Sequence, residues 1–306
     1  MKADLHMHSR YSDGGHWPDE LVGMAATSGL QAVCLTDHDT LGGYPEFADA
    51  AASAGLTTWP AVEIDCIDES IGYRSEILAY FPDGTYAATE ALLRAGRAER
   101  VRTISSLFER ARALFSAPEM DFGSLVSRRQ AGRSPEGPAV DGTALRYAKT
   151  DFFLALIDAG VIPANTRYWE FKQAYFNTGL FSDVRFSKPE LADVVELIVS
   201  DGGIPVLPHV GHEFGDSIKS MRSRAEHLDA ILDRCRDLGV LGIELYDYRT
   251  DDTKAINALV ARQSRRYGFF NTYGSDFHGP GSNKTLFGSF HGDFKGFPRR
   301  KARRKG

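Results

Sequence analysis

The chain has 306 residues, 42% of them hydrophobic, and a net charge of −5, which is ordinary for a globular protein with one large core. It contains no run of eighteen apolar residues and no apolar segment at the N-terminus, so we expect no membrane span and a cytoplasmic location. The three cysteines, Cys34, Cys66 and Cys235, form no CxxC pair, which argues against a disulfide framework.

Strands and helices alternate over the first part of the chain. The sequence predicts strands at 3–8, 31–36, 57–64 and 76–80, with helices at 18–29 and 45–54. Pro18 at the first turn, followed by Asp19 and Glu20, is typical of a helix start. The apolar strands in repeated βα units indicate a parallel sheet covered by helices.

The alternation breaks after residue 85. A long amphipathic helix is predicted at 88–116, a mobile loop rich in Gly, Pro, Ser and Arg at 127–142, and helices at 144–159 and 167–176. We therefore expect an inserted helical region at 86–187. The βα pattern then resumes, with helices at 189–201, 220–238 and 252–266 and strands at 204–208, 241–246 and 269–274.

The first predicted strand carries polar residues on one face. Asp4, His6 and His8 alternate with Leu5 and Met7, so the two imidazoles point to the same side. Two histidines in this spacing can bind one metal ion, although the motif alone is weak. Asp13, in the loop that follows, adds a carboxylate.

More acids and histidines stand at the ends of the other strands. They are Asp37, His38, Asp39, Glu63, Glu76, His209, Glu244, Asp247, Asp276 and His278. Barrel enzymes place their chemistry at the carboxyl ends of the strands. Because unpaired buried carboxylates are costly and divalent cations offset that cost, the pattern predicts a site for several metal ions.

Four of these motifs, taken in order, resemble the PHP (polymerase and histidinol phosphatase) family. They are Asp-Leu-His-Met-His-Ser with Ser12-Asp13-Gly14, Thr36-Asp37-His38-Asp39-Thr40, Glu63, and Gly274-Ser275-Asp276-Phe277-His278-Gly279. The resemblance covers most of the chain and is strongest to stand-alone phosphoesterases such as nucleotide 3′,5′-bisphosphatases. It implies an α/β fold, a distorted (β/α)7 TIM-like barrel, formed by residues 1–85 and 188–298. The helical insertion 86–187 would cover the active site.

The resemblance also implies a trinuclear metal centre with nine protein ligands. The sets are His6, His8, Glu63 and Asp276 for the first metal, Glu63, Glu76 and His209 for the second, and Asp13, His38 and His278 for the third. Two or three divalent ions per chain are expected, with manganese first and iron or zinc as alternatives. Asp37 and Asp39 would orient imidazoles.

The chain departs from the family pattern at two places. Glu76 replaces a metal-binding histidine on the fourth strand, and the added oxygen ligand favours Mn²⁺ or Fe²⁺ over Zn²⁺. In the insertion, Lys149-Thr150-Asp151 stands where the stand-alone branch has Arg-Pro-His. His212 likewise occupies a position that often carries arginine or another polar residue. We expect these positions to face the substrate; for Lys149 and Asp151 the alternative is an exposed helical ion pair.

A metal-dependent phosphoric ester hydrolase is therefore expected, in which a metal-activated hydroxide attacks phosphorus. Candidates for substrate binding are Lys149, Arg249 and Arg10, and His209, His212 or Asp151 would assist proton transfer. The first substrate candidate is a nucleotide 3′,5′-bisphosphate or related phosphomonoester.

Alternative functions remain open at this point. A cyclic phosphodiesterase, a histidinol-phosphate phosphatase and a short-oligonucleotide exonuclease fit the same motifs. A PHP scaffold or nucleic-acid-binding module would instead use the last eight residues, 299–306, which carry six positive charges. We expect this basic tail to be disordered. The sequence gives no oligomeric state.

Overall fold

The computed structural model describes residues 1–118, 120–133, 139–280, 282, 284, 287–288 and 290–298. The chain divides into two compact units. Unit 1 comprises Met1–Leu92 and the chain from Lys188 onward, and unit 2 comprises Leu93–Ser187. The predicted division at 86 and 187, with an insertion that covers the active site, stays a prediction. The basic tail at 299–306 lies outside the described residues.

Unit 1 contains the described strands, which form two sheets. They are β1 (Lys2–Met7), β2 (Ala32–Leu35), β3 (Ala61–Asp65), β4 (Glu76–Tyr80), β5 (Ile204–Leu207), β6 (Gly242–Tyr246), β7 (Phe270–Gly274) and β8 (Gly292–Asp293). The strand orders are β2-β1-β8 and β3-β4-β5-β6-β7. The neighbours β1/β2, β5/β6 and β6/β7 pair in parallel. The expected all-parallel sheet is wrong for β4, which runs antiparallel to both β3 and β5, and for the additional β8.

Isolated bridges connect the two sheets. Ala32 pairs with Thr57 and His38 with Glu63 between the segments of β2 and β3, while Met7 pairs with Phe277 just after β7. The mixed α/β class is confirmed. Among the described residues no continuous ladder joins the two sheets, so the closed seven-stranded barrel stays a prediction.

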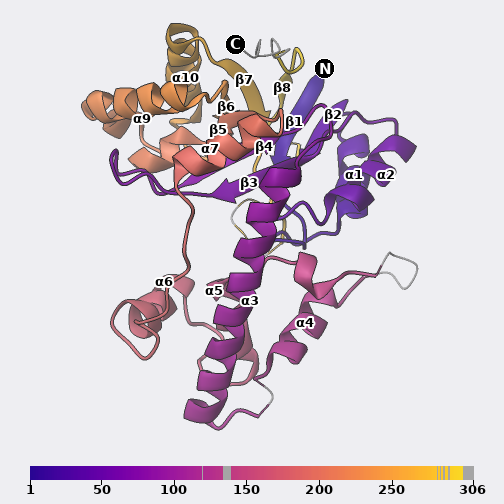
Figure 1. The fold of residues 1–306 in the computed structure, drawn as a ribbon, viewed down its shortest axis with the longest axis vertical. Helices are drawn as coiled ribbons and strands as arrows, with labels where there is room; N and C mark the ends of the chain where they lie inside the picture. The colour runs from indigo at the N-terminus through magenta and orange to yellow at the C-terminus, as the bar shows by residue number, and fades with distance from the viewer. Residues whose placement is uncertain are drawn as a thin grey trace. The chain divides into compact units, whose positions relative to one another are not determined.

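Amphipathic helices cover the strands of unit 1. They are α1 (Pro18–Thr27), α2 (Tyr44–Ser53), α7 (Leu191–Ser200), α8 (Ile218–Ser223), α9 (Ala225–Leu238) and α10 (Thr253–Tyr267). Leu228, Ile231, Leu232 and Cys235 lie on the buried face of α9, with the spacing of an amphipathic helix. Figure 1 shows α1 and α2 beside β1 and β2, and α9 and α10 beside β6 and β7. None of the described helices combines the length and apolar character that a membrane crossing requires.

The strand β1 is buried on both faces. Ala3 and Leu5 pack in one apolar cluster together with Leu78 and Val206, and Met7 packs with helices α1 and α2 in another. Its polar face is equally inaccessible, because Asp4, His6 and His8 have no exposed surface. Such burial of a carboxylate and two imidazoles requires dedicated partners.

An ion pair between a buried carboxylate and a partly exposed arginine links the segment after β3 to α9. Asp68, which follows β3, accepts hydrogen bonds from Ser70 and from Arg234 of α9, the latter at 2.7 Å. Burial opposes ionisation of this carboxyl, but the bonds from Ser70 and Arg234 outweigh it and lower the pKa of Asp68.

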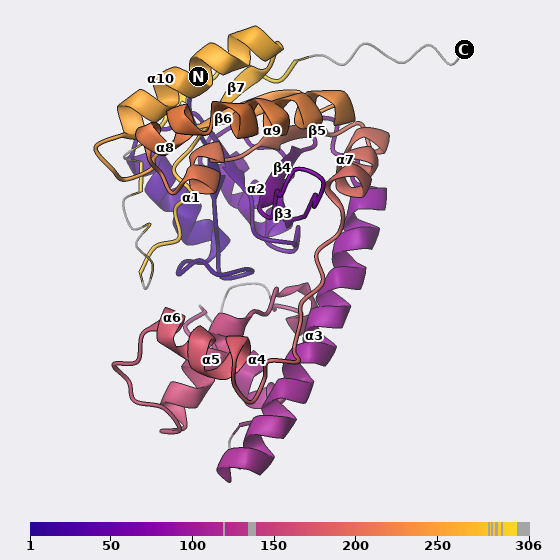
Figure 2. The ribbon, with the colours of Figure 1, turned by 90° about the vertical axis from the view of Figure 1, so that its left-hand side faces the viewer.

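Unit 2 is helical. It contains most of α3 (Ala87–Phe115), then α4 (Phe122–Gln130), a short 3₁₀ turn (Gly142–Ala144), α5 (Lys149–Asp158), α6 (Tyr168–Phe171) and a π-helical segment (Lys172–Asn177). Figure 2 shows α3 as one continuous helix, with α4 and α5 alongside its later part. The ring of Phe152 on α5 lies 5.5 Å from that of Phe108 on α3 and 5.2 Å from that of Phe181.

Two element predictions in unit 2 are wrong in detail. The start of the expected loop at 127–142 is helical in α4, because the Asp121 side chain accepts a hydrogen bond from Ser124 N–H and caps the helix. The helix expected at 144–159 begins only at Lys149, where Asp151 caps the preceding Ala148 N–H.

Candidate metal centre

The first group of candidate ligands forms around His6 of β1 and His8, which comes directly after this strand. His6 Nε2 and His8 Nε2 lie 3.1 Å apart. Both face Glu63 Oε2, at 3.2 and 3.3 Å, and Asp276 Oδ1, at 3.6 and 3.1 Å. Strand β3 supplies Glu63, and the segment after β7 supplies Asp276, so residues far apart in sequence converge on one point.

A second group shares Glu63. While Glu63 Oε2 faces the first group, its Oε1 lies 2.9 Å from His209 Nε2. Glu76 Oε2 lies 4.0 Å from the same nitrogen. Glu76 is the first residue of β4, and because β4 runs antiparallel to its neighbours, its start lies at the edge where the parallel strands end. Glu63 is thus placed between two clusters of donor atoms.

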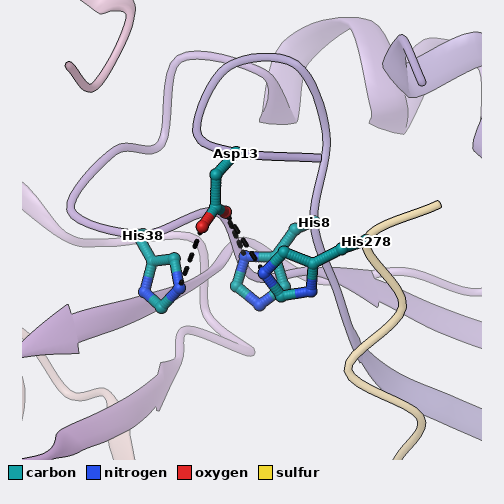
Figure 3. Close-up of side chains that lie close together, drawn as sticks. All are labelled: His8, Asp13, His38 and His278. Carbon is teal, nitrogen blue, oxygen red and sulfur yellow. Dashed lines mark ion pairs between the residues drawn. The ribbon is translucent and has the colours of Figure 1, made fainter. Parts of the chain in front are cut away.

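The third group surrounds Asp13, as Figure 3 shows. Asp13 Oδ1 lies 3.2 Å from His278 Nε2 and 3.9 Å from His8 Nδ1, and Asp13 Oδ2 lies 3.9 Å from His38 Nε2. The structure therefore brings all nine predicted ligands together, but His8 also belongs to the third group, and a further group joins His209 and His212 to Asp276.

The donor set fits divalent metal ions. In each group the nitrogen and oxygen atoms lie within 4.8 Å of one another. His8 Nδ1 and Asp276 Oδ1 are buried, yet no hydrogen-bond partner for either is found among the described residues. Buried polar atoms are normally paired, so these atoms point to an occupant other than protein. Imidazole nitrogens together with carboxylate oxygens suit Mn²⁺, Fe²⁺ or Zn²⁺.

Charge compensation keeps the central carboxylates ionised. Burial opposes ionisation of Glu63 and Asp276. The imidazoles of His6 and His38 nevertheless hold the pKa of Glu63 well below its usual range, and Lys284 and His6 do the same for Asp276. By contrast, burial and the neighbouring Glu63 raise the pKa of Glu76.

Glu244 of β6 orients two of the candidate ligands. Its Oε1 lies 2.9 Å from His6 Nδ1, and its Oε2 accepts a hydrogen bond from the backbone N–H of His209 at 3.1 Å. The carboxylate has no exposed surface. A carboxylate bonded to the rear nitrogen of a ligating imidazole fixes its ring and its tautomer. Glu244 was among the strand-end acids expected from the sequence, but no role was predicted for it. The signal for a role is the presence of an acid within the otherwise apolar strand Gly242–Tyr246.

Asp4 joins β1 to the motif after β7. It accepts hydrogen bonds from the backbone N–H and the hydroxyl of Ser275, at 3.0 and 2.6 Å, and from His6 N–H at 3.3 Å. Burial raises the pKa of Asp4 to about 7, in spite of these bonds. The carboxyl thereby fixes the residue before Asp276 against the first strand.

Asp37 and Asp39 hold loops in place. Asp37 accepts hydrogen bonds from the hydroxyls of Ser9 and Ser12, both at 2.6 Å, and from Ser9 N–H. The expectation that Asp37 orients an imidazole is wrong, since its bonds fasten the loop that carries the Asp13 carboxylate. Asp39 Oδ1 accepts from the backbone N–H of Asp65.

Three residues of unit 1 that were predicted to bind substrate or transfer protons make contacts within the unit. Arg249 donates to the carbonyl oxygens of Asp247 and Ser275 and to the Tyr246 hydroxyl. Arg10 stacks over the ring of Trp17. His212 lies next to His209, with ring centroids 4.5 Å apart, and its Nδ1 is 2.6 Å from Asp216 Oδ1. His212 therefore adjoins the second group of ligands.

Lys149 and Asp151 lie in unit 2. The Lys149 ammonium is 4.2 Å from the ring centroid of Phe176, and Asp151 pairs with Arg129 at 2.7 Å. The expected Lys149–Asp151 ion pair is wrong, because Asp151 is buried and uses its other oxygen to cap α5 at Ala148. Both residues thus have local structural partners.

Comparisons with known proteins agree with this geometry. The profile of the PHP domain matches residues 4–125. A 3′,5′-nucleoside bisphosphate phosphatase from Chromobacterium violaceum is 30% identical, over 91% of this chain and 87% of that protein. A phosphoribosyl 1,2-cyclic phosphate 1,2-diphosphodiesterase from Eggerthella lenta is 25% identical, over 91% and 95%. A 5′-3′ exoribonuclease from Haemophilus influenzae is 27% identical, over 91% and 90%.

Solved structures share the fold. A protein from Bifidobacterium adolescentis superposes with a TM-score of 0.70 at 24% identity, over 93% of this chain and 90% of that one. A Chromobacterium violaceum protein, described as an amidohydrolase and solved with sulfate and no metal, has a TM-score of 0.65 at 28% identity, over 92% and 89%.

Proposed function

The chain belongs to the PHP-domain family and is a metal-dependent phosphoesterase, and from this premise we propose that it removes phosphate from a nucleoside 3′,5′-bisphosphate or a closely related phosphomonoester. The observation that carries this proposal is the shared Glu63, whose two oxygens face two adjoining groups of buried ligands. The name of the Chromobacterium violaceum relative, which matches over nearly the whole chain, supports the choice of substrate.

In this proposal the nine predicted residues hold two or three divalent ions in a distorted (β/α)7 barrel. Clustered divalent ions, when bound, acidify a water molecule and polarise phosphoryl oxygens. Glu63 would help to hold two of these ions, because its two oxygens face two groups of donor atoms, and Glu244 keeps His6 Nε2 directed at the first group. The sulfate in the Chromobacterium violaceum structure is a tetrahedral dianion like phosphate, which supports an anion as ligand.

His212 is the residue to which we assign proton transfer toward the leaving group. Its Nδ1 is bonded to Asp216, so Nε2 is the atom left to hold or release a proton. His209 is already directed at Glu63, and both oxygens of Asp151 are bonded to Arg129 and Ala148. These two residues therefore take no proton-transfer role in the proposal.

Manganese is the first ion we propose, because the second group contains two carboxylates and one imidazole. Oxygen-rich sites suit Mn²⁺ better than Zn²⁺. Metal analysis of protein grown without added metal, followed by reconstitution with Mn²⁺, Fe²⁺ or Zn²⁺, tests this choice. Stoichiometric zinc with full activity would contradict it.

The substrate is tested by hydrolysis of four compounds supplied to the reconstituted protein, with orthophosphate, ring-opened ester and released nucleotide each separated by chromatography and quantified. They are a nucleoside 3′,5′-bisphosphate, a ribose 1,2-cyclic phosphate, histidinol phosphate and a short 5′-phosphorylated oligoribonucleotide. We expect kcat/KM for the bisphosphate to exceed the other three by at least about tenfold, equivalent to about 1.4 kcal/mol in transition-state stabilisation. A higher value for any other compound refutes the substrate assignment, and no hydrolysis at all refutes the enzyme.

An exonuclease is the second candidate, because of the Haemophilus influenzae relative. It would release nucleotides one at a time from the 5′ end of the oligoribonucleotide. Removal of residues 299–306 tests whether the basic tail serves nucleic-acid binding or turnover. Its six positive charges should contribute mainly salt-dependent affinity for the oligoribonucleotide, so a binding role predicts that affinity falls while turnover of small substrates is retained.

A further inference from the structure

Lys284 lies beside the candidate metal centre, and no sequence motif pointed to it. Its backbone carbonyl accepts hydrogen bonds from His278 N–H at 3.0 Å and from Gly279 N–H at 3.1 Å, and its own N–H donates to Ser282 Oγ. These bonds hold the Lys284 backbone against the motif that carries Asp276 and His278. The side chain therefore starts from a fixed point next to the ligands.

The two oxygens of Asp276 have different neighbours. Oδ1 faces His6 and His8, as described above, and is the oxygen directed at the first group of ligands. Oδ2 accepts a hydrogen bond from the Tyr246 hydroxyl at 2.8 Å and another from the Lys284 ammonium. One carboxylate thus separates the ammonium from the place where a metal ion fits.

The Lys284 side chain is more accessible than the carboxylate that it contacts. The Lys284 side chain is 24% exposed, whereas that of Asp276 is 1% exposed. The charge of Lys284 faces the Asp276 carboxylate, with which it forms an ion pair. Divalent ions, when bound, would neutralise the carboxylates of the centre, and the ammonium beside them would keep a positive charge that an anion can match.

The other cations proposed from sequence are placed less well for this task. The guanidinium of Arg249 donates to two carbonyl oxygens and to Tyr246, and that of Arg10 lies over the Trp17 ring. The ammonium of Lys149 lies over the Phe176 ring. Lys284, by contrast, contacts a candidate metal ligand directly.

We propose that Lys284 binds the phosphoryl group of the substrate, an inference that rests on the proposed phosphatase function of the same site. An ammonium has three N–H donors, and Asp276 Oδ2 takes one of them. Among the described residues no acceptor is found for the other two, and in this proposal they donate to phosphoryl oxygens. In this role Lys284 stabilises the charge on the phosphoryl oxygens, and Asp276 holds the ammonium beside the metal ions.

The competing interpretation makes Lys284 a positioning residue for Asp276. The two roles predict opposite effects on metal affinity. A phosphate-binding ammonium repels a nearby cation and competes for Asp276, so Lys284→Met should bind Mn²⁺ at least as tightly as the wild type. A positioning residue should instead lose Mn²⁺ affinity when it is removed.

The test uses inorganic orthophosphate as the probe on the Mn²⁺-loaded full chain. Lys284→Met should weaken orthophosphate binding, measured by isothermal titration calorimetry, by about ten- to a hundredfold, the usual loss for a charge-assisted hydrogen bond. Lys284→Arg should recover most of the affinity, which also shows that loss in the methionine variant is not misfolding. Lys295→Met is the matched control, since Lys295 is 80% exposed and pairs with Asp293. The affinity of this variant for orthophosphate should equal that of the wild type.

Three results would overturn the inference. They are wild-type orthophosphate affinity in Lys284→Met, a joint loss of Mn²⁺ and orthophosphate affinity in that variant, or no orthophosphate binding by the loaded wild type. Orthophosphate binding does not depend on which ester is hydrolysed. If the wild type fails on the bisphosphate but Lys284→Met still loses orthophosphate affinity, the substrate proposal fails and the role of Lys284 stands.

Discussion

Replacing Glu244 by glutamine tests whether the buried carboxylate of β6 organises the metal centre. The side chain accepts two hydrogen bonds, one from His6 Nδ1 at 2.9 Å and one from His209 N–H at 3.1 Å. A glutamine has a single amide oxygen and can accept only one of them. Its NH₂ group would then face the other donor, so Glu244→Gln leaves a buried N–H of His6 or His209 unpaired.

The magnitude follows from these two contacts. Loss of a carboxylate behind a ligating imidazole typically weakens metal binding by about ten- to a hundredfold, equivalent to about 1.4–2.7 kcal/mol. The unpaired donor should lower the free energy of unfolding of the metal-free protein by a further ~1–3 kcal/mol. Glu244 contacts His6 through Nδ1 and His209 through its backbone N–H, and neither atom is directed at a metal ion. The substitution therefore leaves the set of metal-directed atoms unchanged.

The assay is competition for Mn²⁺ between the metal-free protein and a chelator of known affinity, with urea unfolding measured on the same preparations. Glu226→Gln, at an exposed position in the first turn of α9, is the control for loss of one carboxylate and should leave both quantities unchanged. A dissociation constant for Mn²⁺ within about twofold of the wild-type value would refute the argument that Glu244 orients His6.

Three further changes test other parts of the structure. Gly274→Ala would place a methyl group 2.0 Å from Glu244 Oε1, so we expect it to weaken Mn²⁺ binding and lower the free energy of unfolding by ~1–3 kcal/mol. Asp68→Asn removes a carboxylate whose pKa is lowered in the folded state. Its stabilising effect is present above the unfolded pKa and is lost as the pH falls through the folded pKa, so the difference in unfolding free energy from wild type should shrink from pH 6 to pH 3. Glu76→His replaces an oxygen ligand by nitrogen and should shift the Zn²⁺/Mn²⁺ affinity ratio toward Zn²⁺ by about tenfold or more, measured by competition.

Each of these changes has an outcome that contradicts its reasoning. Additive losses in the double variant of Gly274→Ala and Glu244→Gln would show that the methyl group does not act through Glu244, because changes at contacting residues couple. If the difference in unfolding free energy between Asp68→Asn and the wild type does not change with pH, the ion pair with Arg234 is not the cause of the difference. An unchanged Zn²⁺/Mn²⁺ ratio in Glu76→His would mean that Glu76 does not ligate.

The candidate ligands could be predicted from sequence because the motifs are local and the strands that carry them are short and apolar. Glu76 was correctly expected near the other ligands, but the parallel sheet expected at the same time is wrong for its strand. A parallel sheet would put the first residue of β4 at the opposite edge from His209, and the reversed direction of β4 returns it to the site. Strand direction depends on pairing partners far along the chain, which periodicity does not report.

The residues that support the ligands were harder to predict. Lys284 belongs to a segment without periodic pattern, and its place beside Asp276 follows from backbone bonds to His278 and Gly279. Asp37 looked like a partner for imidazoles because of the neighbouring His38, but its bonds go to serines. Which atoms a polar side chain contacts is decided by tertiary packing, and the sequence supplies only its chemistry.

All nine candidate ligands, and Glu244 and Lys284 beside them, belong to unit 1. The donor geometry is built from hydrogen bonds and ion pairs within that unit, such as those of Glu244 to His6 and of Asp4 to Ser275. Residues of unit 2 can therefore change without removing a metal-directed atom. Variants in unit 2 are therefore suitable controls for changes in metal affinity, because they leave every candidate ligand in place.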